Sequence, residues 1–354
     1  MTLAIALLSI GILIILHELG HFLFAKKFGV KVEEFGIGLP PRLFGKKYGE
    51  TIYSVNALPI GGFVRMEGEE KRSDAPGSFS RKPLWQRFFI VAAGVIVFWV
   101  ISIVIFAVLG ATTGIPSAIG DEEENVANSH VRIIGISKDS PAEKSGLQFG
   151  DTILSIGEQP ILRIREVREL SKVYAGQETE ITIQRGKERI LLPLVPRESH
   201  PNDELLGVTL TRAGNVKYAW YEAPWQGLLR TWHVTSSIFE MFGMLISRLI
   251  GGEALPAGTQ IAGPVGIVVL LRDIFALGMP WFLTFVATIS VYLAIFNTLP
   301  IPALDGGRLF FILLEGARRK PLSEKLERRL IFISFLMLIT FIVWVTVNDI
   351  LRLL

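Results

Sequence analysis

The sequence contains no cysteine, which excludes disulfide bonds, thiolate metal ligands and cysteine nucleophiles. It also has little net charge. The formal value is +3 at pH 7, and no basic face interleaved with aromatic residues is present, which argues against nucleic acid as a partner. Half of the 354 residues are hydrophobic, a share too high for an ordinary soluble domain. We therefore expect membrane-spanning helices together with one soluble module.

Long charge-free runs predict four transmembrane helices, since about 20 apolar residues cross the hydrocarbon core. The run 274–304 is free of charge for 31 residues, more than one straight crossing needs. The first apolar run lacks a basic leading region and a small-residue cleavage site, so we expect it to be retained and not removed as a signal peptide. The predicted spans are residues 1–25, 88–110, 278–304 and 330–350.

Positive charge is unevenly distributed around these spans. Residues 25–87 carry twelve Lys or Arg against seven Asp or Glu, and six basic residues lie in the loop 318–329. The twenty residues after Gly110 contain no Lys or Arg but include the acidic run Asp121–Glu124. Short basic flanks mark the cytoplasmic side of a membrane. We predict an outside N-terminus, a cytoplasmic loop over 26–87 and an extracytoplasmic region after the second span.

The first apolar run carries the sequence His17-Glu18-Leu19-Gly20-His21. Positions i and i+4 of a helix lie on one face, so both imidazoles could bind one metal ion, as in the zinc metalloproteases. An acid in a lipid-facing helix costs about 2 to 3 kcal/mol, which makes Glu18 a candidate functional residue. The alternative is a polar seam that joins neighbouring helices.

Residues 126–215 have a different character, with frequent charges and short alternating strands separated by Gly and Pro. The stretch Ser140–Ile156 resembles the signature of bacterial PDZ domains, in which a short helix precedes a Gly-Asp turn and a strand. A PDZ fold implies a groove that accepts an extended peptide by strand addition, bordered here by Leu206–Leu210. The alternative is a β-rich spacer that binds nothing.

Three shorter segments complete the organisation. Tyr53–Met66 mixes strand-forming residues with Pro and a Gly pair, which predicts a short hairpin or edge strand that dips toward the membrane, or else a plain surface hairpin. Residues 224–252 are amphipathic and predict a helix lying at the membrane interface, with His233 on its polar face and not a ligand. Residues 262–267 break the helical periodicity before the third span.

The third span ends in Asn297-Thr-Leu-Pro-Ile-Pro-Ala-Leu-Asp305-Gly-Gly. Two prolines break the backbone hydrogen-bond ladder, and irregular backbone at membrane depth is tolerated only where it lines a cavity. Counted along the two helices, Asp305 reaches a depth similar to that of His17. A catalytic zinc needs three protein ligands and an open position. Two histidines and this carboxylate complete that number.

These features, taken in order along the chain, resemble the site-2 protease family in its bacterial RseP-type branch: the His-Glu-Leu-Gly-His sequence, the PDZ-like stretch, Gly263–Ile267 and the Asn-x-x-Pro-x-Pro-x-Leu-Asp-Gly string. The resemblance implies a polytopic α-helical membrane protein with a membrane-associated β-hairpin and one PDZ-like α+β domain. It also implies a zinc-dependent intramembrane protease. The family's metal ligands fall on His17, His21 and Asp305, its catalytic general base on Glu18 and a substrate-binding amide on Asn297.

The resemblance further implies an inner-membrane protein of a bacterium, with its active site toward the cytoplasmic side. The expected substrates are single-pass membrane proteins already trimmed by another protease, such as anti-sigma factors, or remnant signal peptides. Two departures are present: there is room for one PDZ domain where many relatives have two, and Ala93–Phe98 lacks the family's usual Pro and Asn. The rival classes are a PDZ-bearing membrane scaffold and a transporter, although a transporter's internal repeat is missing.

Overall fold

The computed structural model describes residues 2–69, 71–121, 129–186, 188–199, 204–252 and 263–353. Three sequence features lie partly outside this set: the acidic residues 122–124, the first residues (126–128) of the predicted PDZ-like domain, and Ala262. The chain divides into two compact units. The first comprises residues 1–105, 227–270 and 286–354, and the second comprises 106–226 and 271–285. Each unit is described separately below.

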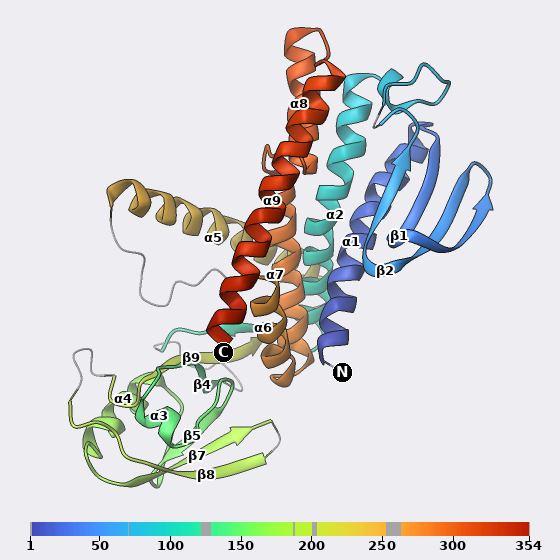
Figure 1. Ribbon diagram of the computed structural model, residues 1–354. Helices are drawn as coiled ribbons and strands as arrows, with labels where there is room; N and C mark the ends of the chain where they lie inside the picture. Colours follow the sequence, from blue (N-terminus) through green and yellow to red (C-terminus); the bar gives the residue numbers. More distant parts are fainter. Residues whose placement is uncertain are drawn as a thin grey trace. The chain divides into compact units, whose positions relative to one another are not determined.

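Among the described residues, four helices are long and apolar enough to cross a membrane. The second and fourth begin four and six residues before the apolar stretches predicted from the sequence, because their first turns contain charged residues. In Figure 1 the first-unit parts of these helices run alongside one another. The four are α1 (Thr2–Lys27), α2 (Leu84–Ala111), α7 (Met279–Thr298) and α9 (Glu324–Leu353).

The long charge-free run 274–304 is interrupted twice. Helix α6 (Pro264–Ala276) ends just before Gly278, whose φ of 105° is open to glycine and costly for other residues, and α7 starts at the next residue. Helix α7 then stops at Thr298, before the two prolines, and α8 (Asp305–Arg318) begins after them. The predicted third span 278–304 therefore contains one helix and a non-helical segment, which explains why its length exceeds one crossing.

Helix α5 (Ala223–Gly251) packs against the bundle of the first unit with only part of its length. Thr235 accepts a hydrogen bond from the Trp99 indole at 3.3 Å, and Thr231 exchanges one with Ser102 at 3.1 Å. Ile238 is buried against α7. Beyond that contact the helix leaves the bundle (Figure 1) and exposes large apolar side chains. These exposed residues are Phe239, Met241, Phe242, Met244, Ile246 and Ile250.

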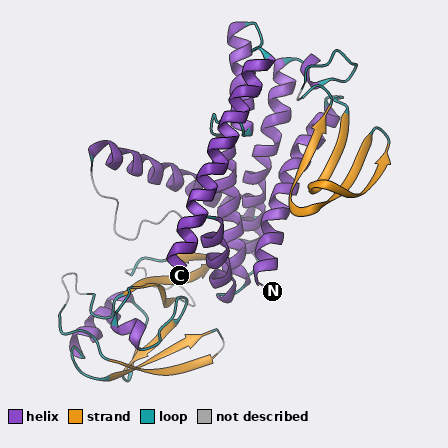
Figure 2. Ribbon diagram, viewed as in Figure 1, coloured by secondary structure: helices purple, strands orange, loops and turns teal. Residues whose placement is uncertain are grey.

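A small antiparallel sheet follows α1 in the first unit. It is built from β1 (Val32–Tyr48) and β2 (Thr51–Met66), drawn as orange arrows beside α1 in Figure 2. Phe35 lies opposite both Val64 and Tyr53, so each long strand folds back and the two strands make four side-by-side segments. Segment 62–66 forms one edge and segment 42–48 the other. The sheet thus begins about twenty residues before the predicted hairpin at Tyr53.

The second unit contains a mainly antiparallel sheet in the order β3-β9-β4-β5-β7-β8, with β6 paired to β5. Its core is closed by aliphatic side chains such as Ile133, Ile153 and Ile181, all at most 1% exposed. Ser140 caps the short helix α3 by accepting a hydrogen bond from the Glu143 amide at 3.2 Å. The elements are β3 (Ile115–Ala118), β4 (His130–Ile136), α3 (Pro141–Lys144), β5 (Thr152–Ile156), β6 (Gln159–Pro160), α4 (Ile164–Val173), β7 (Thr179–Arg185), β8 (Glu188–Leu194) and β9 (Val208–Val216).

Candidate metal centre and active-site cavity

Helix α1 places His17 and His21 one turn apart on its buried face. Both residues are only 7% exposed, and their Nε2 atoms lie 3.2 Å from each other. The spacing of four residues brings the two rings together as the helical repeat requires. The two Nε2 atoms are thus close enough to be ligands of one cation.

Asp305 is brought to the same place by the tight turn before α8. A Cβ atom at Gly306 would overlap the carbonyl oxygens of Thr298 and Leu299, and one at Gly307 would overlap that of Ile301. The two glycines thus let α8 start directly against the preceding loop. Asp305, the first residue of α8, consequently points its carboxylate at α1.

The three side chains form a nearly equilateral set of donor atoms. Asp305 Oδ2 lies 3.1 Å from His17 Nε2 and 3.3 Å from His21 Nε2. A tetrahedral zinc ion with bonds of about 2.0–2.1 Å holds its ligand atoms about 3.3 Å apart, so the observed edges fit. Among the described residues, these three form the one group of at least three His, Asp or Glu side chains whose ligand atoms are close enough to bind a single metal ion.

Residues around the histidines fix their orientation. His21 Nδ1 donates to the carbonyl oxygen of Ile90 at 2.9 Å, which leaves Nε2 of the neutral ring with its lone pair directed at the other two donors. The His17 ring stacks on the buried Phe98 ring with centroids 4.7 Å apart. Gly94 lies directly beneath His21, since a Cβ there would be 2.7 Å from Cδ2 and closer still to Nε2 and Cε1.

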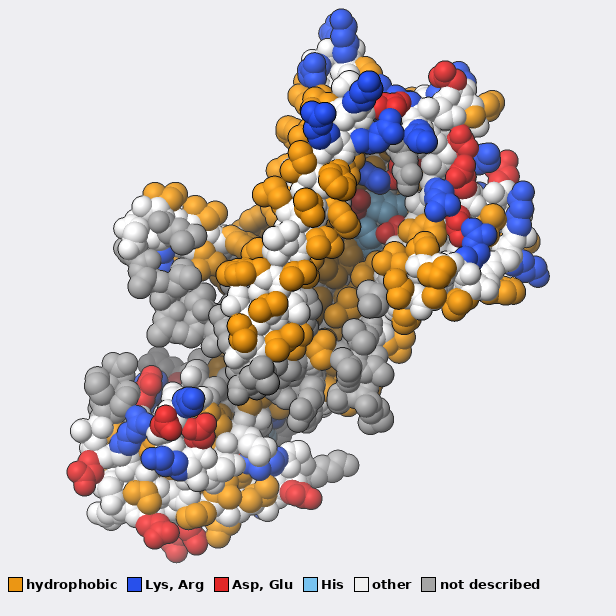
Figure 3. All heavy atoms as spheres, viewed as in Figure 1, with side chains coloured by type: hydrophobic (Ala, Val, Ile, Leu, Met, Phe, Trp, Pro, Cys, Tyr) orange, Lys and Arg blue, Asp and Glu red, His pale blue; other side chains and the backbone are white. Residues whose placement is uncertain are grey.

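Glu18 lines a cavity of about 340 Å³ next to this cluster. The cavity lies between α1, the start of α8 and the edge segment 62–66, and in Figure 3 histidine side chains are visible in the hollow there. Gly62 lies next to Glu18, since a Cβ built at position 62 would be in van der Waals contact with Glu18 Cγ at 3.5 Å. The remaining lining residues are His21, Leu39, Pro40, Phe63, Val64, Arg65, Glu69, Asp305 and Arg308.

The structure brings four of the five sequence-predicted site residues together and leaves the fifth apart. Asn297 lies near the end of α7, where its amide donates to the carbonyl oxygen of Leu293 at 2.9 Å. It is not among the residues that line the cavity beside Glu18. In this conformation the Asn297 side chain is hydrogen-bonded to the backbone of its own helix, and its amide is not presented to the metal cluster.

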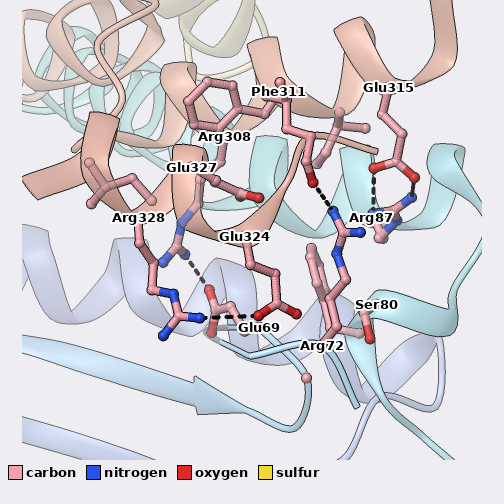
Figure 4. Close-up of a pocket in the computed structure, with 15 residues that line it drawn as sticks. Glu69, Arg72, Ser80, Arg87, Arg308, Phe311, Glu315, Glu324, Glu327 and Arg328 are labelled. Carbon is pink, nitrogen blue, oxygen red and sulfur yellow. Dashed lines mark hydrogen bonds and ion pairs between the residues drawn. The ribbon is translucent and has the colours of Figure 1, made fainter. Parts of the chain in front are cut away.

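The sequence analysis missed two residues at the cavity. Arg308 follows Asp305 by one turn of α8 and forms an ion pair with Glu69, which comes from the turn after β2. Figure 4 shows this pair, and the Glu69 carboxylate raises the pKa of Arg308 further above its usual range. The i, i+3 spacing from Asp305 could have pointed to Arg308. Glu69 could not have been found, because its partner is 239 residues away.

Comparison with known proteins matches residues 5–341 to the model of peptidase family M50. A Clostridium perfringens protein named as a candidate zinc metalloprotease is 34% identical over 98% of this chain and 97% of its own length. The zinc metalloprotease RasP of Oceanobacillus iheyensis is 28% identical over 98% of both chains. Among solved structures, the PDZ domain of an SdrC-like protein from Listeria monocytogenes shares 19% identity over 24% of this chain and 92% of its own, with a TM-score of 0.22.

The match to the family model spans nearly the whole chain, and the geometry and donor chemistry of the cluster fit zinc. The apolar helices make the chain a multi-pass membrane protein, as the resemblance implied. The prediction of a zinc-dependent enzyme is confirmed, and the scaffold and transporter classes are set aside. The chain belongs to peptidase family M50, the site-2 protease family of zinc metallopeptidases.

Proposed function

We propose that this metallopeptidase cleaves peptide bonds within the transmembrane segments of other membrane proteins. The observation that carries the proposal is the position of the donor cluster. His17 and His21 lie in the apolar helix α1, and Asp305 reaches them from the helix that follows the apolar α7. A substrate bond must therefore come to apolar helices to be cut, which suits a membrane-embedded peptide.

In this proposal His17, His21 and Asp305 hold the zinc ion, and Glu18 acts as the catalytic acid and base. A zinc ion held by these three residues would act as a Lewis acid and would lower the pKa of water at the site to about 7. Glu18 follows His17 in sequence and lines the cavity, so its carboxylate can take a proton from water there and later return it to the departing amine. Phe98 and Ile90 keep the imidazoles in place during these steps.

The edge segment 62–66 is the candidate docking site for the unwound substrate. It borders the cavity, and among the described residues it pairs with β1 on one side and with no strand on the other. An extended chain could pair with such a free edge through backbone hydrogen bonds. Asn297 would hold the substrate backbone only after its amide leaves Leu293, so we propose that this contact forms on substrate entry.

We further propose a bacterial inner-membrane location, with the basic loops at residues 26–87 and 318–329 in the cytoplasm. Figure 3 shows Lys and Arg side chains gathered where α8 meets α9. The second unit, with a groove between α4 and β9 lined by Val167, Arg168 and Leu206, would be an extracytoplasmic PDZ domain. The substrates of the protease would be single-pass membrane proteins shortened beforehand by another protease, as in regulated intramembrane proteolysis.

The test uses the full chain in lipid vesicles with single-pass model substrates labelled at both ends. Mass spectrometry of the products should place the cut inside the apolar segment. Glu18→Gln should retain one zinc per chain and the wild-type melting temperature while losing cleavage. Cuts confined to the soluble flanks, or normal turnover by Glu18→Gln, would refute the proposal.

A further inference from the structure

The cavity beside Glu18 is lined by a positively charged side chain, Arg308, to which the proposed mechanism gives no role. Arg308 lies one turn after Asp305 on α8 and lines the same cavity as Glu18 and His21. Hydrolysis of a peptide bond places negative charge on the carbonyl oxygen in the transition state. Fixed hydrogen-bond donors aimed at that oxygen typically contribute 10²–10³ in kcat.

The described lining residues offer two side chains, besides the metal ligands, that can donate such a hydrogen bond: Arg65 and Arg308. Arg65 is engaged elsewhere. Its Nη1 donates to the buried Glu34 carboxylate at 3.2 Å, and its guanidinium lies over the Phe63 ring at 5.5 Å. Arg308, in contrast, comes from the same helical turn as the ligand Asp305. The charges of Asp305 and Glu18 both act on its guanidinium, which places Arg308 near the reacting centre.

Glu69 holds the Arg308 guanidinium in place through one of its N–H groups, and other N–H groups remain available as hydrogen-bond donors. One of its terminal nitrogens, Nη1, donates to Glu69 Oε1, and Glu69 Oε2 accepts a weak hydrogen bond of 3.4 Å from the Met66 amide. A guanidinium carries five N–H groups in a rigid fork, so one bond to Glu69 leaves others for a substrate. Glu69 itself is only 8% exposed, which limits its freedom to move.

Met66 ends the edge segment 62–66, so Glu69 connects that edge to Arg308. A peptide that lies along the edge would border the cavity that Glu18, Asp305 and Arg308 also line. We propose that Arg308 is a further catalytic residue, which donates a hydrogen bond to the scissile carbonyl oxygen, and that Glu69 is its positioning residue. The inference rests on peptide hydrolysis at this site, and it does not depend on where in the substrate the bond lies.

The opposing explanation is a structural ion pair that only joins α8 to the turn after β2. A matched control exists in the neighbouring pocket of Figure 4. There Arg87 on α2 forms a two-bond ion pair with Glu315 on α8, at 2.7 and 3.1 Å. Arg87 does not line the cavity beside Glu18. A structural role predicts equal effects of changing Arg87 or Arg308, whereas a catalytic role does not.

The experiment compares Arg308→Gln, Arg308→Lys, Glu69→Gln and Arg87→Gln in the full chain reconstituted in lipid vesicles. We measure zinc per chain, melting temperature, kcat, KM and the affinity of a phosphinic peptide, whose tetrahedral anion mimics the transition state. Arg308→Gln should lose about 10²–10³ in kcat with KM and zinc within twofold of wild type. The affinity of Arg308→Gln for the phosphinic peptide should fall by a similar factor. Arg87→Gln should keep the wild-type kcat and the wild-type affinity for the phosphinic peptide.

Arg308→Lys keeps the charge without the fork and should lie between wild type and Arg308→Gln. Glu69→Gln should lower kcat by about tenfold through misplacement of the guanidinium. Unchanged kcat and phosphinic affinity in Arg308→Gln would overturn the inference, as would losses of the same size in Arg87→Gln. The wild-type rate tests the proposed function, whereas the ratio of each variant to it, together with the phosphinic affinity, tests Arg308.

Discussion

Gly94→Ala should damage the zinc site from the neighbouring helix, without changing any ligand. A Cβ at position 94 would lie 2.7 Å from His21 Cδ2 and closer to Nε2 and Cε1. Carbon atoms pack at about 3.5–4.0 Å, so the ring must retreat by about 1 Å. Metal–ligand distances tolerate only about 0.2 Å. His21 cannot then reach the metal position and also keep its hydrogen bond to Ile90.

Loss of a group that orients a metal-bound histidine typically costs 10–100-fold in metal affinity. We expect at least that loss in Gly94→Ala, equivalent to about 1.4–2.7 kcal/mol. The assay is competition for zinc with a fluorescent chelator, in detergent. Gly243→Ala on α5 is the control, because no described atom lies within 4 Å of a Cβ built there. Zinc affinity within twofold of wild type in Gly94→Ala would refute the argument that α2 positions His21.

The other predictions concern the folded units and the metal. Asp151→Ala should lower the melting temperature of the second unit, because the buried Asp151 carboxylate accepts two hydrogen bonds of 2.8 Å from Arg185, whose side chain is 33% exposed. Lost hydrogen bonds to charged groups cost about 1.5–3 kcal/mol each, and calorimetry should show the loss with zinc content unchanged. Glu34→Ala should make the β1/β2 sheet more sensitive to limited proteolysis, because the buried Glu34 carboxylate accepts hydrogen bonds from Arg42 at 2.8 and 3.0 Å. Each lost hydrogen bond to a charged group costs about 1.5–3 kcal/mol. A digestion rate equal to that of wild type would contradict this prediction. Treatment with 1,10-phenanthroline should abolish peptide cleavage and added zinc should restore it, whereas added magnesium should not, because imidazole ligands suit zinc and magnesium requires oxygen ligands.

Much of the site could be predicted because its evidence is local in sequence. The spacing of His17 and His21 is a helical repeat within one apolar run, and the prolines around Ile301 mark irregular backbone at depth. The link between the histidines and Asp305 is not local: the count of depth along the two helices suggested it, and the family resemblance implied the same three ligands. The structure adds the distances that make the three donors a metal site.

The remaining features depend on contacts between distant segments. Gly94 has no pattern of its own in α2, and its role appears only when His21 packs on it. The β1 strand was missed because Gly, Pro and Lys interrupt its alternation, although it pairs with β2 along most of its length. The Glu69–Arg308 pair likewise joins segments more than two hundred residues apart. No periodicity within either segment indicates such a contact.

The central claim is that both ends of the chain bind one zinc ion. X-ray absorption at the zinc edge, measured on wild type and Asp305→Ala, tests it most directly. We predict one zinc per chain in wild type, with two imidazoles and oxygen ligands at about 2.0–2.1 Å. We predict substoichiometric zinc, or a spectrum with one fewer oxygen contribution from the protein, in Asp305→Ala. Full zinc content with an unchanged spectrum in that variant would contradict the account.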